Sequence, residues 1–290
     1  MPLLQCIPLA KTAIKCSLAP NSHLSFFDKA SAHLATLVSV AVLTFAPAAF
    51  ADDAARGLEI ATEVKNRDRG WVDTSADMEM ILRSPDGRES VRQIRVKTLE
   101  VDDDGDKSLT IFDAPRDVEG TAFLSFSHIE GPDDQWIYLP AVKRVKRIAT
   151  RNKSGPFMGS EFAFEDMVSF EVEKFTFKYL RDEQLDGRDM YVVEQVPVDE
   201  FSGYSKQIVW VDKEHYRLEQ TEFYDRKGAL LKVLSLDDYQ QYEGQYWRAL
   251  RADMDNMQTG KSTTLLTSDL RFKEGLDTKD FDKNALRRAK

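Results

Sequence analysis

Side chains that could catalyse a reaction are few in this chain of 290 residues. Beyond residue 51 it has two histidines, His128 and His215, and neither has a second metal ligand at a recognised spacing. Two pairs of adjacent carboxylates could act as general acid and base, but neighbouring side chains on a strand or turn diverge: Asp133 with Asp134, and Glu165 with Asp166. The motifs of a nucleophile elbow, a zinc-protease helix and a phosphate loop are missing from the sequence. We therefore predict no enzyme, no metal site and no cofactor, and keep a hydrolase that uses one of the histidines as an alternative.

An acidic run, four aspartates and one glycine at residues 102–106, is the other candidate metal site. It lacks the ligand spacing and the terminal glutamate of an EF-hand calcium loop. We interpret it as a solvated turn between two strands.

A dense cluster of cations follows a short aromatic strand, at Lys143, Arg144, Lys146 and Arg147. Lysine and arginine on an edge strand prevent aggregation, which is the simpler interpretation. The alternative is a basic rim that binds a phosphate headgroup or an acidic partner surface. Both interpretations stay open at this point.

The strand before this cluster, at residues 135–139, is apolar on both faces, because Trp136 and Tyr138 alternate with Ile137 and Leu139. A sheet that meets water on one side would not need this pattern, so a helix or a ligand must cover the second face. Downstream, residues 152–159 hold two glycines and a proline and form a loop that can move.

A short aromatic segment comes next and has the character of a lid. Ser160 is a candidate N-cap for a helix of one or two turns at residues 161–167. This helix would carry Phe162, Phe164 and Met167, which do not share one helical face, so we expect burial on two sides of a concave sheet.

The elements that must position these residues are mostly strands. One helix is expected at residues 52–66, with Leu58, Ala61 and Val64 at helical spacing, and a short one at residues 280–289, held by Phe281 and Leu286. Between them the apolar period becomes two, and turn residues such as Ser84-Pro85-Asp86-Gly87 separate the strands. About a dozen strands are expected, at residues 72–82, 89–101, 107–112, 121–129, 135–139, 143–149, 170–180, 189–197, 206–211, 217–224, 230–239, 246–255 and 262–272. The sequence therefore predicts a mainly β (α+β) domain, a single antiparallel sheet that curls towards a barrel.

The first 51 residues have the features of a signal peptide. Residues 34–45 are an apolar run, too short to span a bilayer comfortably, and Ala49-Phe50-Ala51 is a cleavage site. Both cysteines, Cys6 and Cys16, lie in this leader, so the mature chain at residues 52–290 has no disulfide. We predict an exported protein, with cleavage near Ala51.

Charge excludes a large class of partners. The formal net charge is −9, and because the leader contributes +2, the mature chain carries about −11. General nucleic-acid binding is not expected of so acidic a protein. We expect a monomer.

Three segments carry a resemblance to a known family: residues 136–147 (WIYLPAVKRVKR), 159–167 (GSEFAFEDM) and 209–233 (VWVDKEHYRLEQTEFYDRKGALLKV). With the order of signal peptide, amphipathic helix and long antiparallel sheet, the chain resembles the periplasmic LolA/LolB-like superfamily, and in particular its "outer membrane lipoprotein-sorting protein" branch. The resemblance covers nearly all of the mature chain.

The resemblance implies an incomplete β-barrel, stoppered by short lid helices around an apolar cavity for acyl chains. It further implies a carrier or adaptor that passes a lipid or lipidated protein between membranes, together with an RND-type transporter of the inner membrane. A periplasmic sensor that binds a signal on the same fold is the alternative from another functional class.

Such a cavity needs adaptable apolar walls, for which methionine and aromatic side chains are suited. Our candidate lining residues are Met78, Met80, Trp136, Tyr138, Phe162, Phe164 and Met167. Ordinary core packing is the competing interpretation for each of them.

Overall fold

The computed structural model describes residues 47–288. They form helix α1 (Pro47–Arg67), helix α2 (Ala285–Arg288) and one sheet of thirteen strands. The strands are β1 (Asp73–Arg83), β2 (Glu89–Leu99), β3 (Lys107–Ala114), β4 (Ala122–Phe126), β5 (Asp134–Leu139), β6 (Arg144–Ile148), β7 (Phe175–Leu185), β8 (Arg188–Pro197), β9 (Tyr204–Asp212), β10 (Leu218–Asp225), β11 (Leu230–Tyr242), β12 (Tyr246–Asn256) and β13 (Ser262–Phe272).

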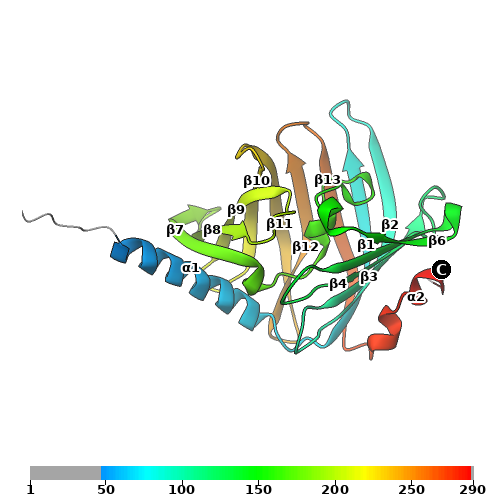
Figure 1. Ribbon diagram of the computed structural model, residues 1–290, viewed down its shortest axis with the longest axis horizontal. Helices are drawn as coiled ribbons and strands as arrows, with labels where there is room; N and C mark the ends of the chain where they lie inside the picture. Colours follow the sequence, from blue (N-terminus) through cyan, green and yellow to red (C-terminus); the bar gives the residue numbers. More distant parts are fainter. Residues whose placement is uncertain (1–46, 289–290) are drawn as a thin grey trace, which may run out of the picture. The chain divides into compact units, whose positions relative to one another are not determined.

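The sheet is antiparallel throughout and does not close. Its order is β6-β5-β4-β3-β2-β1-β13-β12-β11-β10-β9-β8-β7, so β6 and β7 are the two edges (Figure 1). The first and last strands of the chain pair in the middle, where Met80 of β1 lies opposite Leu265 of β13. The predicted fold, a mainly β domain with one antiparallel sheet curved into an incomplete barrel, is confirmed.

Local turn chemistry explains why the strand boundaries were predictable. In the β1–β2 hairpin the backbone N–H of Gly87 donates to the carbonyl of Ser84 at 2.9 Å, and Gly87 has a φ of +83°, which glycine adopts at little cost. One strand was misplaced at both ends: β7 spans Phe175–Leu185, not residues 170–180. Residues 172–174 form a 3-10 turn instead, and the Phe170 ring stacks on the Phe175 ring at 5.8 Å.

Helix α1 packs on the inner face of strands β7 to β9 through most of the apolar positions expected from the sequence. Ile60 and Ala61 are buried against Val193 and Val209 of the sheet, and Val64 packs beside them, whereas Leu58 is 47% exposed. The reason lies one residue earlier. A Cβ at Gly57 would come within 2.9 Å of the backbone of residue 178, so glycine lets the helix backbone approach β7 closely.

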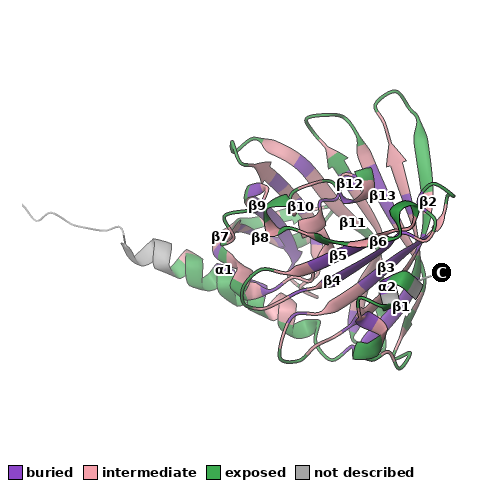
Figure 2. Cartoon of the chain, turned by 45° about the vertical axis from the view of Figure 1, so that its right-hand side comes forward, coloured by how far each residue is buried: buried purple, intermediate pink, exposed green. Residues whose placement is uncertain are grey.

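The C-terminal segment covers the convex face of strands β2 to β5. Phe281 and Leu286 are almost completely buried and pack with Trp136 and Leu124. The predicted cover for the second face of β5 is therefore protein, with a 3-10 turn at Thr278–Phe281 ahead of α2. Buried residues lie mostly within the strands, and exposed ones in the turns and along α1 (Figure 2).

Most of the expected leader, residues 1–46, lies outside the described residues. Helix α1 begins at Pro47, ahead of the expected cleavage site near Ala51, and cleavage there stays a prediction. In the part of the chain that the structure describes, no helix has both the length and the apolar character needed to cross a membrane.

Candidate functional site

The concave face of the sheet is covered by one irregular stretch, residues 153–174, here called the crossing segment. It hydrogen-bonds to strands from both halves of the sheet. Gln135 of β5 donates to the carbonyl of Phe164 at 2.7 Å, and Thr263 of β13 accepts from the backbone of Glu161 at 3.0 Å. Arg92 of β2 donates to the carbonyl of Met158. The segment therefore bridges strands that are far apart in the sheet.

The predicted lid helix at residues 161–167 is reduced to one 3-10 turn, Phe164–Met167. Within the described crossing segment this turn follows a first one, Phe157–Gly159, and precedes a third, Val172–Lys174. Ser160 is not an N-cap: its hydroxyl donates to the carbonyl of Phe157 at 2.7 Å and closes the first turn. The second turn is capped from within, because the carboxylate of Asp166 accepts from the backbone N–H of Ala163 at 2.7 Å. Two separate turns let Phe157 and Phe164 point at the same core, which one short helix would not.

An aromatic cluster fixes the segment to strands β3 and β4. The Phe157 ring lies 5.0 Å from Phe123 and 5.9 Å from Phe112, and the Phe164 ring lies 5.6 Å from Phe157. Phe112, Phe123 and Phe157 are completely buried. Edge-to-face aromatic contacts add to the burial of apolar area, so this end of the segment is firmly packed.

A buried polar triad fixes the middle of the segment to β9 and β11. The Lys232 ammonium lies 2.6 Å from the Asp166 carboxylate, whose other oxygen accepts from the Tyr204 hydroxyl at 2.8 Å. Lys232 also lies 5.1 Å from the centre of the Phe223 ring. Burial and the nearby Asp166 carboxylate raise the pKa of Tyr204 well above its usual value, so this phenol remains a hydrogen-bond donor.

The neighbouring carboxylate is anchored to the loop between β8 and β9. Glu165 accepts from the Ser202 hydroxyl at 2.7 Å and from the Gly203 backbone at 2.8 Å. Burial raises its pKa despite these hydrogen bonds. A Cβ at Gly203 would lie 2.7 Å from the Cβ of Ser154 and 2.9 Å from Glu165, so glycine is required for this close contact.

A cavity of about 730 Å³ lies beside the crossing segment, over the inner face of strands β8 to β11. This volume is within the usual range for ligand sites, roughly 300–1,000 Å³. Its walls are mainly apolar and come from the crossing segment, the strands and the β8–β9 loop: Phe162, Val168, Phe170, Phe175, Pro197, Val198, Phe201, Tyr204, Leu218, Phe223, Leu234 and Met254. Val198 and Phe201 are exposed at the rim.

Five of the seven predicted lining residues belong to the inner core under the crossing segment. Met80 and Phe162 are buried there, and Met78, Phe164 and Met167 pack against them. Phe162 also lines the large cavity, and Met167 lines a smaller one of about 370 Å³ beside Trp71. Ligand contact by these residues stays a prediction.

Trp136 and Tyr138 lie on the opposite face of the sheet and pack with the C-terminal segment. The prediction that they line the cavity was wrong, because the large cavity on the concave face does not include them. The reason is the two-residue period of β5, which points Ile137 and Leu139 inward and the two aromatic rings outward. The sequence pattern showed two apolar faces but not which of them is concave.

The four cations of the basic cluster are exposed on the edge strand β6 and the turn before it. Arg144 and Lys146 pair with the inward-facing residues of β5, and Arg147 pairs with Trp136 on the outer face. Arg147 forms an ion pair with Asp134, whereas Lys143 has a φ of +53° at the turn. This placement fits an edge strand kept from aggregating, and binding by the cluster stays a prediction.

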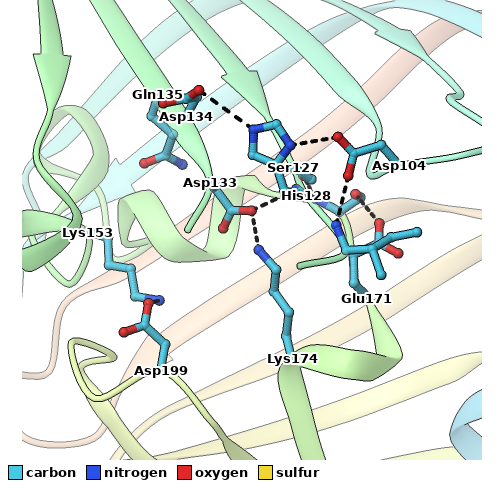
Figure 3. A network of polar contacts seen from close by, with 12 residues as sticks. Asp104, Ser127, His128, Asp133, Asp134, Gln135, Lys153, Glu171, Lys174 and Asp199 are labelled. Carbon is cyan, nitrogen blue, oxygen red and sulfur yellow. Dashed lines mark hydrogen bonds and ion pairs between the residues drawn. The ribbon is translucent and has the colours of Figure 1, made fainter. Parts of the chain in front are cut away.

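The histidines and carboxylate pairs singled out for chemistry have structural partners. Figure 3 shows His128, whose Nδ1 lies 2.7 Å from Asp104 and whose Nε2 lies 3.7 Å from Asp134. Asp133 forms an ion pair with Lys174. His215, elsewhere in the fold, stacks on Trp247 with ring centres 4.9 Å apart. Neither histidine contacts a serine, threonine or cysteine hydroxyl or thiol among the described residues.

The acidic run after β2 does more than form a solvated turn. Asp104 accepts from the backbone N–H of Ile129 at 2.9 Å, and although burial opposes ionisation, the His128 hydrogen bond holds the pKa of Asp104 below its usual value. Burial raises the pKa of Asp106 to about 6, with Glu171 and Glu100 adding repulsion. Within residues 47–288, no group of three or more potential metal ligands is close enough to hold an ion.

Several residues of the site were missed by the sequence analysis, above all Lys232, Gln195 and Gln207. Each occupies an inward position of a strand whose neighbouring inward positions are apolar or small, such as Leu234 after Lys232. A polar residue at an apolar strand position was the available signal, because a buried polar group needs a partner.

Comparisons with known proteins agree with this architecture. A family model described as an uncharacterized protein matches residues 104–288. A Vibrio parahaemolyticus crystal structure, described as an outer membrane lipoprotein-sorting protein domain, is 62% identical, with a TM-score of 0.80, and the match covers 81% of this chain and 100% of that one. A DUF1329 family protein from Desulfovibrio piger is 28% identical, with a TM-score of 0.77, and coverage of 81% and 99%.

A more distant structure, a LolA superfamily protein from Nitrosomonas europaea, is 22% identical, with a TM-score of 0.64, over 79% of this chain and 98% of that one. This likeness concerns the fold alone. No curated protein matches the chain significantly. The chain therefore belongs to the outer membrane lipoprotein-sorting protein family and has the LolA-like fold.

Proposed function

We propose that this protein is a periplasmic carrier that holds an acyl chain of a lipid or lipidated protein in the cavity beside the crossing segment and passes it between membranes. The observation that carries the proposal is the apolar cavity of about 730 Å³ on the concave face. Burial of each methylene contributes about 0.8 kcal/mol, so ten methylenes supply roughly 8 kcal/mol without polar contacts.

The route into the cavity is suggested by its rim. Val198 and Phe201 are exposed there by 60% and 41%, and both line the cavity. Exposed apolar side chains beside an apolar cavity provide a surface along which an acyl chain can enter without passing through water. As the partner that delivers or receives the cargo we propose an RND-type transporter of the inner membrane, on the strength of the family resemblance.

The protein acts in this proposal by binding and release, without turnover. The histidines and paired carboxylates have structural partners, as described for Asp104 with His128 and for Asp166 with Lys232. Of these contacts, the ion pair between Asp166 and Lys232 holds the crossing segment in place beside the cavity.

Native mass spectrometry of the mature protein isolated from the periplasm, followed by organic extraction, tests the proposal. We expect a stoichiometric lipid or acylated species. The variant Leu234→Trp places an indole in the cavity and should weaken the affinity for the acyl ligand about tenfold, which corresponds to about 1.4 kcal/mol. The matched control is Val233→Trp, one residue earlier on β11 and outside the cavity lining. An empty parent protein that takes up no acyl ligand when one is added contradicts the proposal.

A further inference from the structure

Three buried polar side chains lie on the floor of the large cavity, among apolar ones. Gln195 of β8, Gln207 of β9 and Thr221 of β10 line it, and their exposed fractions are 7%, 8% and 3%. Gln195 and Gln207 are directly opposite in the β8–β9 pair. Carrying acyl chains requires apolar walls only, so the carrier proposal does not account for these three side chains.

The two glutamines satisfy only half of their hydrogen-bonding groups. Nε2 of Gln195 donates to Oε1 of Gln207 at 2.5 Å. This leaves the carbonyl oxygen of Gln195 and the amide N–H groups of Gln207 without a side-chain or backbone partner among the described residues. If both amides are turned over, the free groups exchange places, and one donor and one acceptor still remain.

These free groups open onto the cavity. Within the described residues, Ser125 Oγ is the one fully buried side-chain polar atom that lacks a hydrogen-bond partner. The unpaired amide groups, and the Thr221 hydroxyl, which has no partner within residues 47–288, are therefore accessible from the space that their residues line. A bound molecule can pair with a donor and an acceptor lying side by side.

Charges at the mouth oppose an anionic ligand group. Lys153 lies 2.6 Å from Asp199, and Lys174 forms an ion pair with Asp133, so both lysines of the lining are neutralised (Figure 3). The lining also includes Glu130 and Glu173, for which no ion pair is found within the described residues. A carboxylate or phosphate entering here meets net negative charge.

We propose that the ligand of this cavity is an uncharged acyl compound with a hydroxyl or secondary amide group within its apolar part, bound by Gln195, Gln207 and Thr221. A hydroxyl and a secondary amide both donate and accept, as the free glutamine groups require, whereas an ester only accepts. This inference rests on the proposed carrier function and specifies the chemistry of its cargo.

The test compares four uncharged probes on delipidated protein: methyl stearate, methyl 3-hydroxystearate, methyl 12-hydroxystearate and N-methylstearamide. Binding is measured by displacement of the fluorescent methyl ester of parinaric acid. We expect at least one hydroxyl or amide probe to bind about three- to tenfold more tightly than methyl stearate, as one additional hydrogen bond provides. The probe with the larger preference distinguishes a hydroxylated from an amide-linked cargo.

Variants assign the preference to the floor of the cavity. The double variant Gln195→Leu with Gln207→Leu should lose the preference and bind methyl stearate at least as tightly as the parent does. Thr221→Val should weaken the preference without changing the side-chain shape. The control Gln220→Leu, one residue before Thr221 on β10 and outside the lining, should retain the preference.

Two failures are distinguishable. If no probe displaces the fluorophore and the parent does not bind it, the carrier function itself is contradicted. If all four probes bind the parent equally, or if the preference survives in the double leucine variant, acyl binding holds and this inference is overturned.

Discussion

Replacing Lys232 by methionine leaves the Asp166 carboxylate buried without its cation. The Lys232 side chain is 4% exposed, the Asp166 side chain 8%, and 2.6 Å separates the ammonium from the carboxylate. Removing one partner of a buried ion pair costs about 3–5 kcal/mol, because the remaining charge has lost both water and partner. For a domain of this size the melting temperature should fall by roughly 6–20 °C.

The effect should be local as well as global, because Lys232 also donates to the carbonyl of Glu161 at 2.8 Å. Hydrogen exchange of Lys232→Met should show lost protection in the crossing segment around Ala163, while the C-terminal segment on the convex face keeps its protection. The second variant, Asp166→Asn in the Lys232→Met background, removes the unpaired charge and should recover at least about 1 kcal/mol of the loss.

The control is Lys206→Met, which breaks the more exposed pair with Glu194 and should cost less than about 1 kcal/mol. The reasoning is refuted if Lys232→Met melts within about 2 °C of the parent. It is also refuted if the double variant is no more stable than the single one, since the penalty would then not come from a stranded carboxylate.

Three further predictions concern other parts of the molecule. The pKa of Asp106 is raised from 3.8 to about 6, so its contribution to stability is present below about pH 4 and is lost as the pH rises through 6; Asp106→Asn should therefore match the parent near pH 4 and melt higher than it near pH 8, and equal melting at both pH values would contradict this. Gly57→Ala should destabilise the protein in urea unfolding because its Cβ would meet the β7 backbone at 2.8 Å, whereas helix propensity alone predicts a gain of about 1 kcal/mol. Charge reversal of the basic cluster, Lys143, Arg144, Lys146 and Arg147, should reduce co-sedimentation with anionic vesicles in a salt-dependent way. Unchanged binding would leave the cluster a purely structural role.

The strands and turns were predictable because they are determined locally. The alternation in β1 and the Ser84-Pro85-Asp86-Gly87 turn fix a hairpin from neighbouring residues alone, and the structure pairs Arg83 with Glu89 across it. The lid segment was predicted less well because its structure is not determined locally. Its local pattern was ambiguous, and contacts of Phe157 and Asp166 with distant strands selected two 3-10 turns instead.

The sequence by itself determined most of the strands, the first helix, the antiparallel sheet and the family, because period-two patterns and turn residues act over short distances. Only the tertiary structure decided which side chains of each strand lie on the concave face of the sheet. Because of this curvature, Trp136 packs under the C-terminal segment, and Asp166 contacts Lys232, which lies 66 residues further along the chain. It also placed Gln195 beside Gln207 on the cavity floor. These pairings depend on the curvature and register of thirteen strands together, and no short stretch of sequence contains that information.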